Sequence, residues 1–137
     1  MAFLEKDKDN IITFYGGEPL LNTQQIKEVM GKIPANRFML QTNGLLLHKL
    51  DKEYRNLFHT ILLSIDGNEI ITDYYRGIGT YKKVLENAKL IKKTGFKGEL
   101  VARMTVDEKT QIFRQVIHLL DLGLFDSIHW QLNMCFF

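Results

Sequence analysis

Cysteine is almost absent from the 137-residue sequence, which contains one, Cys135. A disulfide within the chain is therefore impossible, and a cysteine-based metal site cannot be built from this chain alone. Long apolar runs are absent as well, since none approaches the ~20 residues that a membrane helix needs, and no signal peptide opens the chain. These absences argue against a membrane protein and predict a cytoplasmic one.

A strong charge of one sign is also lacking. The formal net charge is +2 and the pI is about 8.6, values too mild to predict binding to nucleic acid. The lysine pairs at 82–83 and 92–93 fit the solvated face of a helix, because no aromatic residues are interleaved with them. With 45% hydrophobic and 25% charged residues, the composition predicts one globular domain over residues 1–137.

The most informative stretch begins at Ile11. It is β-branched or aromatic at every position through Tyr15, which is typical of a strand buried on both faces. Gly16 and Gly17 follow at once, so the backbone there can take positive φ and a ligand can approach it closely, and Pro19 stiffens the turn. In α/β folds, loops at the carboxyl ends of strands bind ligands. A tight turn that binds nothing is the alternative.

Strand and helix patterns alternate along the whole chain. Strands are expected at residues 11–15, 37–41, 60–65, 98–105 and 128–134. Helices are expected from residue 22 or 23 to a stop at residues 31–34, then over 45–56, 80–94 and 108–122, with a loop over 66–79. This alternation predicts an α/β fold with a parallel sheet, in which polar residues at the strand ends form one rim. Those polar residues are Glu18, Thr42, Asn43, Ser64, Asp66, Arg103, Thr105, Gln131 and Asn133.

Three motifs resemble those of radical S-adenosylmethionine (SAM) enzymes, in the same order. They are Thr13-Phe14-Tyr15-Gly16-Gly17-Glu18-Pro19-Leu20-Leu21, Gln41-Thr42-Asn43-Gly44, and Ser64-Ile65-Asp66-Gly67 with Arg76 twelve residues after Ser64. The resemblance covers nearly the whole chain. It implies a partial (β/α)6 TIM-like barrel, a parallel sheet with outer helices, of which this chain supplies strands two to six.

The resemblance also implies roles for individual residues. Gly16, Gly17 and Glu18 would hold the amino group of SAM, mainly through backbone carbonyls. Ser64 would form a hydrogen bond with the ribose or the carboxylate end of SAM. Arg76 would form a charge-assisted pair with the SAM carboxylate, in a geometry that lysine cannot reproduce.

Thr42 and Asn43 lie where the family lines its cofactor cavity. The residues alone leave other interpretations open, namely turn formation by Thr42 and Asn43, a Ser64 hydroxyl satisfied by a neighbouring strand, and a surface position for Arg76. Asp66 is either a turn former or a carboxylate on the rim. A phosphate site at the Gly-Gly pair is disfavoured, because such loops usually carry more glycines or a Lys-Ser/Thr pair.

One part of the family pattern is missing. Radical SAM enzymes hold a [4Fe–4S] cluster through a Cys-x3-Cys-x2-Cys run upstream of Gly-Gly-Glu-Pro, and no such run occurs here. The chain is therefore expected to be a truncated core that lacks the cluster-binding first β/α unit. SAM is the expected cofactor, with the [4Fe–4S] cluster only in the full-length parent, and no metal ligand is assigned in this chain.

The leading hypothesis is a fragment of an enzyme. Its parent would generate a 5′-deoxyadenosyl radical from SAM, and the motifs are most similar to the branch that modifies peptides and proteins, including sulfatase maturases. The fragment itself is expected to be inactive. The competing hypothesis is a non-catalytic α/β binding module, or a fragment that forms homo-oligomers through an exposed sheet edge.

Overall fold

The structure, a computed structural model, describes residues 9–133. Within these residues one sheet contains all the strands: β1 (Ile11–Phe14), β2 (Arg37–Thr42), β3 (Phe58–Ser64), β4 (Glu99–Val106) and β5 (Ser127–Leu132). Every neighbouring pair is parallel, and the strand order follows the chain. The predicted α/β fold with a parallel sheet is confirmed.

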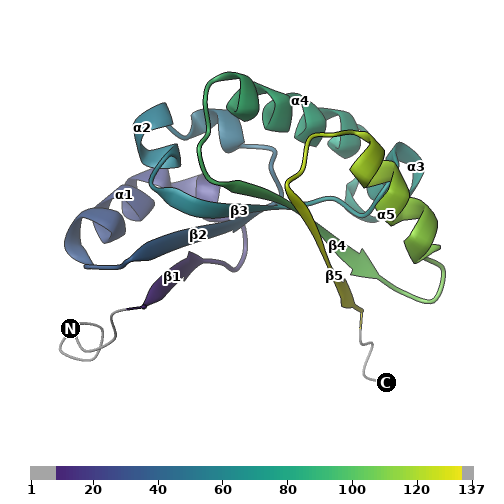
Figure 1. Ribbon diagram of the computed structural model, residues 1–137, viewed down its shortest axis with the longest axis horizontal. Helices are drawn as coiled ribbons and strands as arrows, with labels where there is room; N and C mark the ends of the chain where they lie inside the picture. The colour runs from purple at the N-terminus through teal and green to yellow at the C-terminus, as the bar shows by residue number, and fades with distance from the viewer. Residues whose placement is uncertain (1–8, 134–137) are drawn as a thin grey trace.

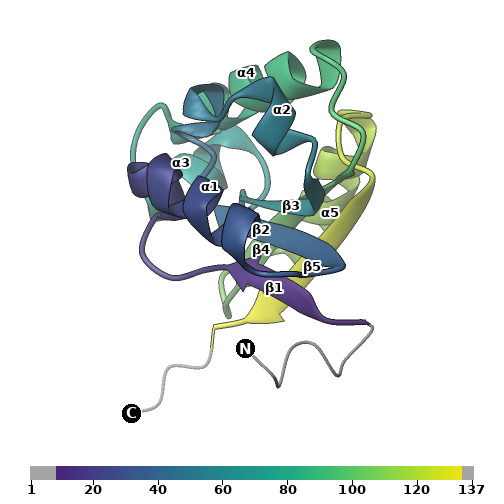
Figure 2. The same cartoon turned by 90° about the vertical axis from the view of Figure 1, so that its left-hand side faces the viewer.

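Helical segments fill the connections between the strands. They are the 3-10 turn η2 (Pro19–Asn22), α1 (Thr23–Lys32), the 3-10 turn η3 (Leu47–Lys49), α2 (Lys52–Arg55), α3 (Glu69–Arg76), α4 (Thr80–Lys93) and α5 (Ile112–Asp121). The sheet curves like an arch and the helices lie on its convex side (Figure 1). Figure 2 shows the same layering from the β1 edge. In the described part of the chain the concave face carries no helix.

The hydrophobic core lies between the sheet and the helices. Its fully buried side chains include Leu40, Ile61, Leu63, Leu100 and Met104 from the central strands and Val84, Ala88 and Ile91 from α4. Side chains alternate along a strand, so Arg103 and Thr105 of β4 face the concave side, where they are only partly buried. Polar groups therefore gather on the face that the helices leave uncovered.

Three expected segments differ from the structure. The predicted loop over residues 66–79 contains α3, an eight-residue helix capped by Asn68, whose Oδ1 accepts a hydrogen bond from Ile71 N at 3.1 Å. The predicted helix over 45–56 is only η3 and α2. The helix predicted from residue 108 begins at Ile112, because Asp107 and Thr110 form a turn through Thr110 N and Asp107 O, 3.1 Å apart.

The expectation that the first strand is buried on both faces is wrong. Ile11 is 47% exposed and Tyr15 is 69% exposed, and exposed residues alternate with partly buried ones along β1, so one face of the strand is left uncovered. Among the described residues β1 is also an edge strand, which pairs with β2 alone. Unpaired backbone at such an edge is compatible with association, but homo-oligomerisation stays a prediction. Met134 and Cys135 lie outside the described residues. No described helix is long and apolar enough to cross a membrane.

Candidate functional site

Six of the seven predicted site residues line one cavity at the carboxyl ends of β1 to β4. The cavity has a volume of about 280 Å³. Its lining consists of Tyr15, Gly16, Gly17, Gln41, Thr42, Asn43, Ser64, Arg76, Arg103 and Thr105. Glu18, the seventh, borders a neighbouring cavity of about 370 Å³ between the Gly-Gly loop and α1. The rim predicted from the strand ends is thus present as a hollow that collects residues from distant parts of the sequence.

The Gly-Gly loop presents bare backbone to this cavity. Gly16 and Gly17 have φ values of +93° and +54°, which favour glycine, and a Cβ added at either residue would meet no atom within 4 Å. Neither residue's backbone N–H or C=O forms a hydrogen bond within residues 9–133. These groups are therefore available to a ligand, and the space beside them is open.

Glu18 uses both its backbone and its side chain in the loop after β1: its backbone oxygen accepts a hydrogen bond from Leu21 N at 3.1 Å. Its Oε1 accepts hydrogen bonds from Leu20 N at 3.0 Å and Thr42 Oγ1 at 2.7 Å, and its Oε2 accepts one from Asn43 N at 2.8 Å. The carboxylate therefore fixes the loop after β1 to the end of β2. In this arrangement Glu18 positions the glycines.

Thr42 and Asn43 form turn contacts as well as lining the cavity. Thr42 Oγ1 accepts a hydrogen bond from Gly44 N at 3.0 Å, and Asn43 Oδ1 accepts one from Leu45 N at 2.9 Å. The turn interpretation therefore holds for both side chains. The Asn43 amide nitrogen has no partner within residues 9–133, so it remains able to donate to a ligand.

Ser64 ends β3 and is only 6% exposed. Its hydroxyl forms no hydrogen bond with any other residue in the described range, which argues against satisfaction by a neighbouring strand. The hydroxyl is not one of the fully buried polar atoms that lack a partner, so it opens onto the cavity. Since Ser64 borders the cavity, a bound ligand or solvent in the cavity would provide that partner.

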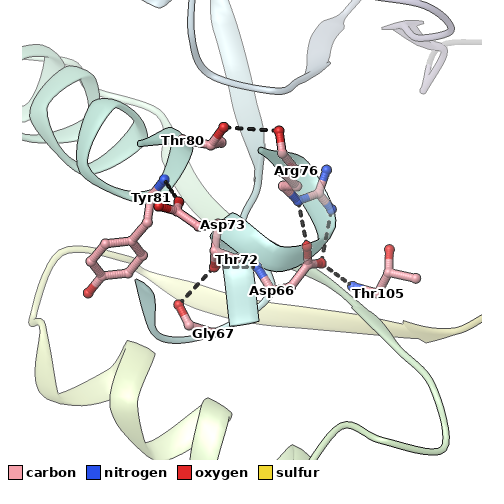
Figure 3. A network of polar contacts seen from close by, with 8 residues as sticks. All are labelled: Asp66, Gly67, Thr72, Asp73, Arg76, Thr80, Tyr81 and Thr105. Carbon is pink, nitrogen blue, oxygen red and sulfur yellow. Dashed lines mark hydrogen bonds and ion pairs between the residues drawn. The ribbon is translucent and has the colours of Figure 1, made fainter. Parts of the chain in front are cut away.

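Asp66 and Arg76 form a charged pair at the end of β3 (Figure 3). Asp66 is 1% exposed, and its Oδ1 accepts hydrogen bonds from Arg76 Nη2 at 2.9 Å and from Thr105 N at 2.8 Å. Its Oδ2 lies 2.6 Å from Arg76 Nε, an ion-pair contact without hydrogen-bond geometry. Asp66 is therefore a buried rim carboxylate that joins β3 to β4, and Arg76, with 22% of its side chain exposed, is not a surface arginine.

The start of α3 holds this pair in place. Thr72 is fully buried, and its Oγ1 accepts a hydrogen bond from Asp66 N at 3.2 Å and donates one to Gly67 O at 3.1 Å. Gly67 has φ of +136°, and a Cβ there would lie 2.3 Å from Gln115 Oε1. Glycine is required at this position for both reasons.

The end of α3 is tied to the start of α4, as Figure 3 also shows. Asp73 accepts hydrogen bonds from the backbone amides of Gly79 at 2.7 Å and Tyr81 at 2.8 Å. Thr80 Oγ1 donates to Arg76 O at 3.1 Å. Both ends of α3 are thus fixed, so the helix that the sequence pattern missed is the element that delivers Arg76 to the cavity.

Sequence reasoning placed Arg103 and Thr105 on the rim without assigning them to the SAM site. The strand pairing gives a reason to include Arg103 in the site, because Arg103 lies directly opposite Ser64 on the same face of the sheet. Tyr75 was also unassigned. Its hydroxyl donates to the carboxylate of Asp107, a contact that raises the pKa of Tyr75 to about 12 and lowers the pKa of Asp107. This pair borders an adjoining cavity of about 190 Å³.

Comparison with known families decides the affiliation. The model described as the Radical SAM superfamily matches residues 1–120. The chain belongs to the radical SAM superfamily. Members of this superfamily bind SAM and a [4Fe–4S] cluster. The matched range contains all seven predicted site residues. A search of curated proteins gave no match.

Solved structures of anSMEcpe, an anaerobic sulfatase-maturating radical SAM enzyme, share the fold. "Native anSMEcpe with bound AdoMet" has a TM-score of 0.74 and 23% identity, over 95% of this chain and 39% of that one. "Native anSMEcpe with bound AdoMet and Kp18Cys peptide" has a TM-score of 0.76 and 23% identity, over 96% and 40%. This chain therefore spans about two fifths of the length of those proteins and matches a partial radical SAM barrel.

The residues present fit SAM but not the cluster. Unpaired backbone at Gly16 and Gly17, the unpartnered hydroxyl of Ser64 and open space beside them suit a polar ligand. By contrast, residues 9–133 contain no group of three or more His, Cys, Asp or Glu side chains that could hold a metal ion. No step of a mechanism is therefore assigned to a cluster bound by these residues.

Proposed function

We propose that this chain is the SAM-binding part of a radical SAM enzyme that modifies peptides or proteins. The observation that carries the proposal is the cavity of about 280 Å³ where residues of three separate motifs meet. Gly16, Thr42, Ser64 and Arg76 come from different strand ends and from α3, so local turn formation does not explain their meeting.

The polar groups of SAM each have a suitable partner in this cavity. The carbonyls of Gly16 and Gly17 would accept hydrogen bonds from the ammonium group of the methionine end. The hydroxyl of Ser64 would bond the ribose or the carboxylate, and the amide of Asn43 would extend the polar lining. Arg76 would contribute the guanidinium N–H groups that Asp66 leaves free. Glu18 would keep the glycine loop in its binding shape.

The bound cofactors supply the radical chemistry of the superfamily, and the protein contributes binding, orientation and exclusion of water. We propose that the cluster ligands belong to a longer parent protein, and that this chain alone has no radical activity. The peptide present in one anSMEcpe structure supports a peptide or protein as the substrate of that parent.

Titration of SAM against the chain by isothermal calorimetry tests the binding proposal. Ser64→Ala and Asn43→Ala should each weaken binding about three- to tenfold, the loss of roughly one hydrogen bond. Arg114→Ala, on the exposed face of α5, is the matched control and should change nothing. Absence of binding, or equal affinity in all four proteins, would remove the SAM site.

A binding module without catalysis is the second candidate, favoured by the lack of cluster ligands within residues 9–133. The DNA upstream of the codon for Met1 separates the two. An in-frame Cys-x3-Cys-x2-Cys run would support the enzyme, and a reading frame without one would support the module.

A further inference from the structure

Helix α5 carries apolar side chains on two opposite faces. On the inner face Leu119 is fully buried and Val116 packs against the core. The outer face bears Phe113, Ile117 and Leu120, which are 78%, 41% and 54% exposed. In Figure 1, α5 lies at one end of the helix layer. A helix that is apolar all round is normally covered on every side, and within residues 9–133 no element covers this outer face.

The uncovered apolar surface continues onto β5, which contacts α5. Parallel pairing sets Trp130 opposite the core residue Met104, and Leu132, two residues further along, leaves the same side of the strand. Trp130 is 48% exposed and Leu132 is 59% exposed. Exposed apolar surface that extends over more than one element is typical of a contact surface for another protein.

Arg114 and Asp121 border the outer face of α5. Both are exposed, and neither forms an ion pair or a side-chain hydrogen bond with another residue in the described range. They are seven residues apart, which is about two helical turns, so they lie in line along one side of the helix. Phe113 and Leu120, also seven residues apart, lie in line along the other side, and Ile117 lies between the two rows.

We propose that the outer face of α5 binds the same face of a second copy of this chain, with the two helices antiparallel about a two-fold axis. An axis that passes between residues 117 and 118 brings Arg114 of each copy to Asp121 of the other. On the opposite side it brings Phe113 of each copy to Leu120 of the other, and the two Ile117 side chains meet at the centre. Reversed in direction, the face is therefore complementary to itself in charge and in shape, as a two-fold contact requires.

This partner surface is a helix face and not a sheet edge, and it does not depend on the SAM site. A helix of ten residues is only about 15 Å long, so the contact lies at the small end of specific interfaces. We therefore expect a weak dimer, with a dissociation constant on the order of 10–100 µM.

Sedimentation velocity over protein concentrations from about 5 to 500 µM tests the proposal. The wild type should shift from monomer to dimer within this range. Ile117→Asp places a carboxylate at the centre of the contact, next to its own copy, and should remain a monomer throughout. Arg114→Glu and Asp121→Lys each set two like-charge pairs across the axis, so the dissociation constant of each variant should rise about tenfold.

Mixing the two charge variants gives the sharpest result. In a mixed dimer the new carboxylate of Arg114→Glu faces the new ammonium group of Asp121→Lys, and one native pair remains. The equimolar mixture should therefore dimerise as tightly as the wild type, although each variant alone does not. The double variant Arg114→Glu/Asp121→Lys should also recover, because its two pairs are attractive with their signs exchanged.

Lys89→Glu is the matched control. Lys89 is exposed on α4, and its reversal changes the net charge by the same amount as Arg114→Glu, so this variant should dimerise like the wild type. At low protein concentration the charge variants should unfold at the same urea concentration as the wild type, since the two side chains have no partner to lose within residues 9–133. A wild type that is monomeric at every concentration overturns the proposal. So does a dimer that Ile117→Asp leaves intact, or a mixture that associates no better than its components.

Discussion

Glu18 and Asp66 each join the end of one strand to the end of the next, but their surroundings differ. Glu18 links β1 to β2, is partly exposed, and accepts hydrogen bonds from neutral donors only. Asp66 links β3 to β4, is 1% exposed, and faces the guanidinium of Arg76 as well as a backbone amide. A carboxylate with access to water needs no opposite charge, whereas a buried one must be paired.

This difference separates a binding region from a structural one. At the Glu18 end the backbone of the glycine loop has no partner within residues 9–133, so it is free for a ligand. At the Asp66 end the polar groups contact one another, through hydrogen bonds and the ion pair of Asp66 with Arg76, and α3 and two strands meet there. Stability should therefore depend mostly on Asp66, and ligand affinity on the loop that Glu18 holds. Four substitutions test this, in order of decreasing effect.

Asp66→Ala should give the largest loss of stability. Removing one partner of a buried ion pair costs about 3–5 kcal/mol, and because 22% of the Arg76 side chain is exposed we expect the lower end, about 3 kcal/mol. Urea unfolding monitored by circular dichroism measures this loss. The Asp66→Ala/Arg76→Ala double variant should lose less than the sum of the two single variants. A loss below about 1 kcal/mol would mean that the pair behaves as an exposed one.

Thr72→Val should be the next most damaging. The two residues have similar shape, but valine leaves Asp66 N and Gly67 O without their partner in a fully buried place. An unsatisfied buried group costs about 1–3 kcal/mol, so we expect a loss of about 2 kcal/mol in the same urea experiment. Thr72→Ser, which keeps the hydroxyl, is the control and should lose less. Equal losses in both variants would attribute the effect to packing.

These contacts mark the boundary of what the sequence could predict. The strands were foreseeable, because their apolar periods and the glycines at their ends are local signals, and so was the convergence of Gly16, Thr42, Ser64 and Arg76 on one rim. The exposure of one face of β1 could not be predicted in this way. Ile11 is as apolar as a core strand residue, but its exposure depends on whether another layer covers its face of the sheet, which the local sequence does not contain.

Helix α3, at the site, is a second feature that the local sequence did not predict. Its eight residues are too few for a clear helical period, and its cap depends on Asn68, whose neighbours Asp66 and Gly67 suggest a turn. Helix α3 brings Arg76 to Asp66. Because the helix was not predicted, the sequence did not show whether Asp66 forms a turn or is a carboxylate on the rim. The partner of a charged side chain is set by the tertiary structure, and a local sequence pattern does not reveal it.

Glu18→Ala should cost less stability than either change near Asp66. Three hydrogen bonds are lost, but the site is partly exposed and water can replace the carboxylate, so we expect about 1 kcal/mol. The SAM affinity of this variant should fall about tenfold or more, because the Gly16-Gly17 loop is no longer held in its binding shape. Calorimetry and urea unfolding on the same sample separate the two effects. A variant that loses stability but binds SAM normally would contradict the division of roles.

Tyr75→Phe should have the smallest effect, since its partner Asp107 is a partly exposed carboxylate on the same rim. The hydrogen bond from Tyr75 lowers the pKa of Asp107 in the folded protein, so phenylalanine should raise that pKa towards its ordinary value. A lowered carboxyl pKa stabilises the fold above the unfolded value of about 4, and this contribution is lost as the pH falls through the folded pKa. Carboxyl-carbon NMR titration of Asp107 measures the shift directly.

The titration of Tyr75 at alkaline pH provides an independent check on the same pair. The contact raises the pKa of Tyr75 from 10.0 to about 12, so its contribution to stability is present below pH 10 and is lost as the pH rises towards 12. The wild type should therefore be more stable than Tyr75→Phe at neutral pH, and this advantage should disappear at both pH extremes. A difference of the same size at every pH would mean that Tyr75 acts through packing and not through its hydrogen bond to Asp107.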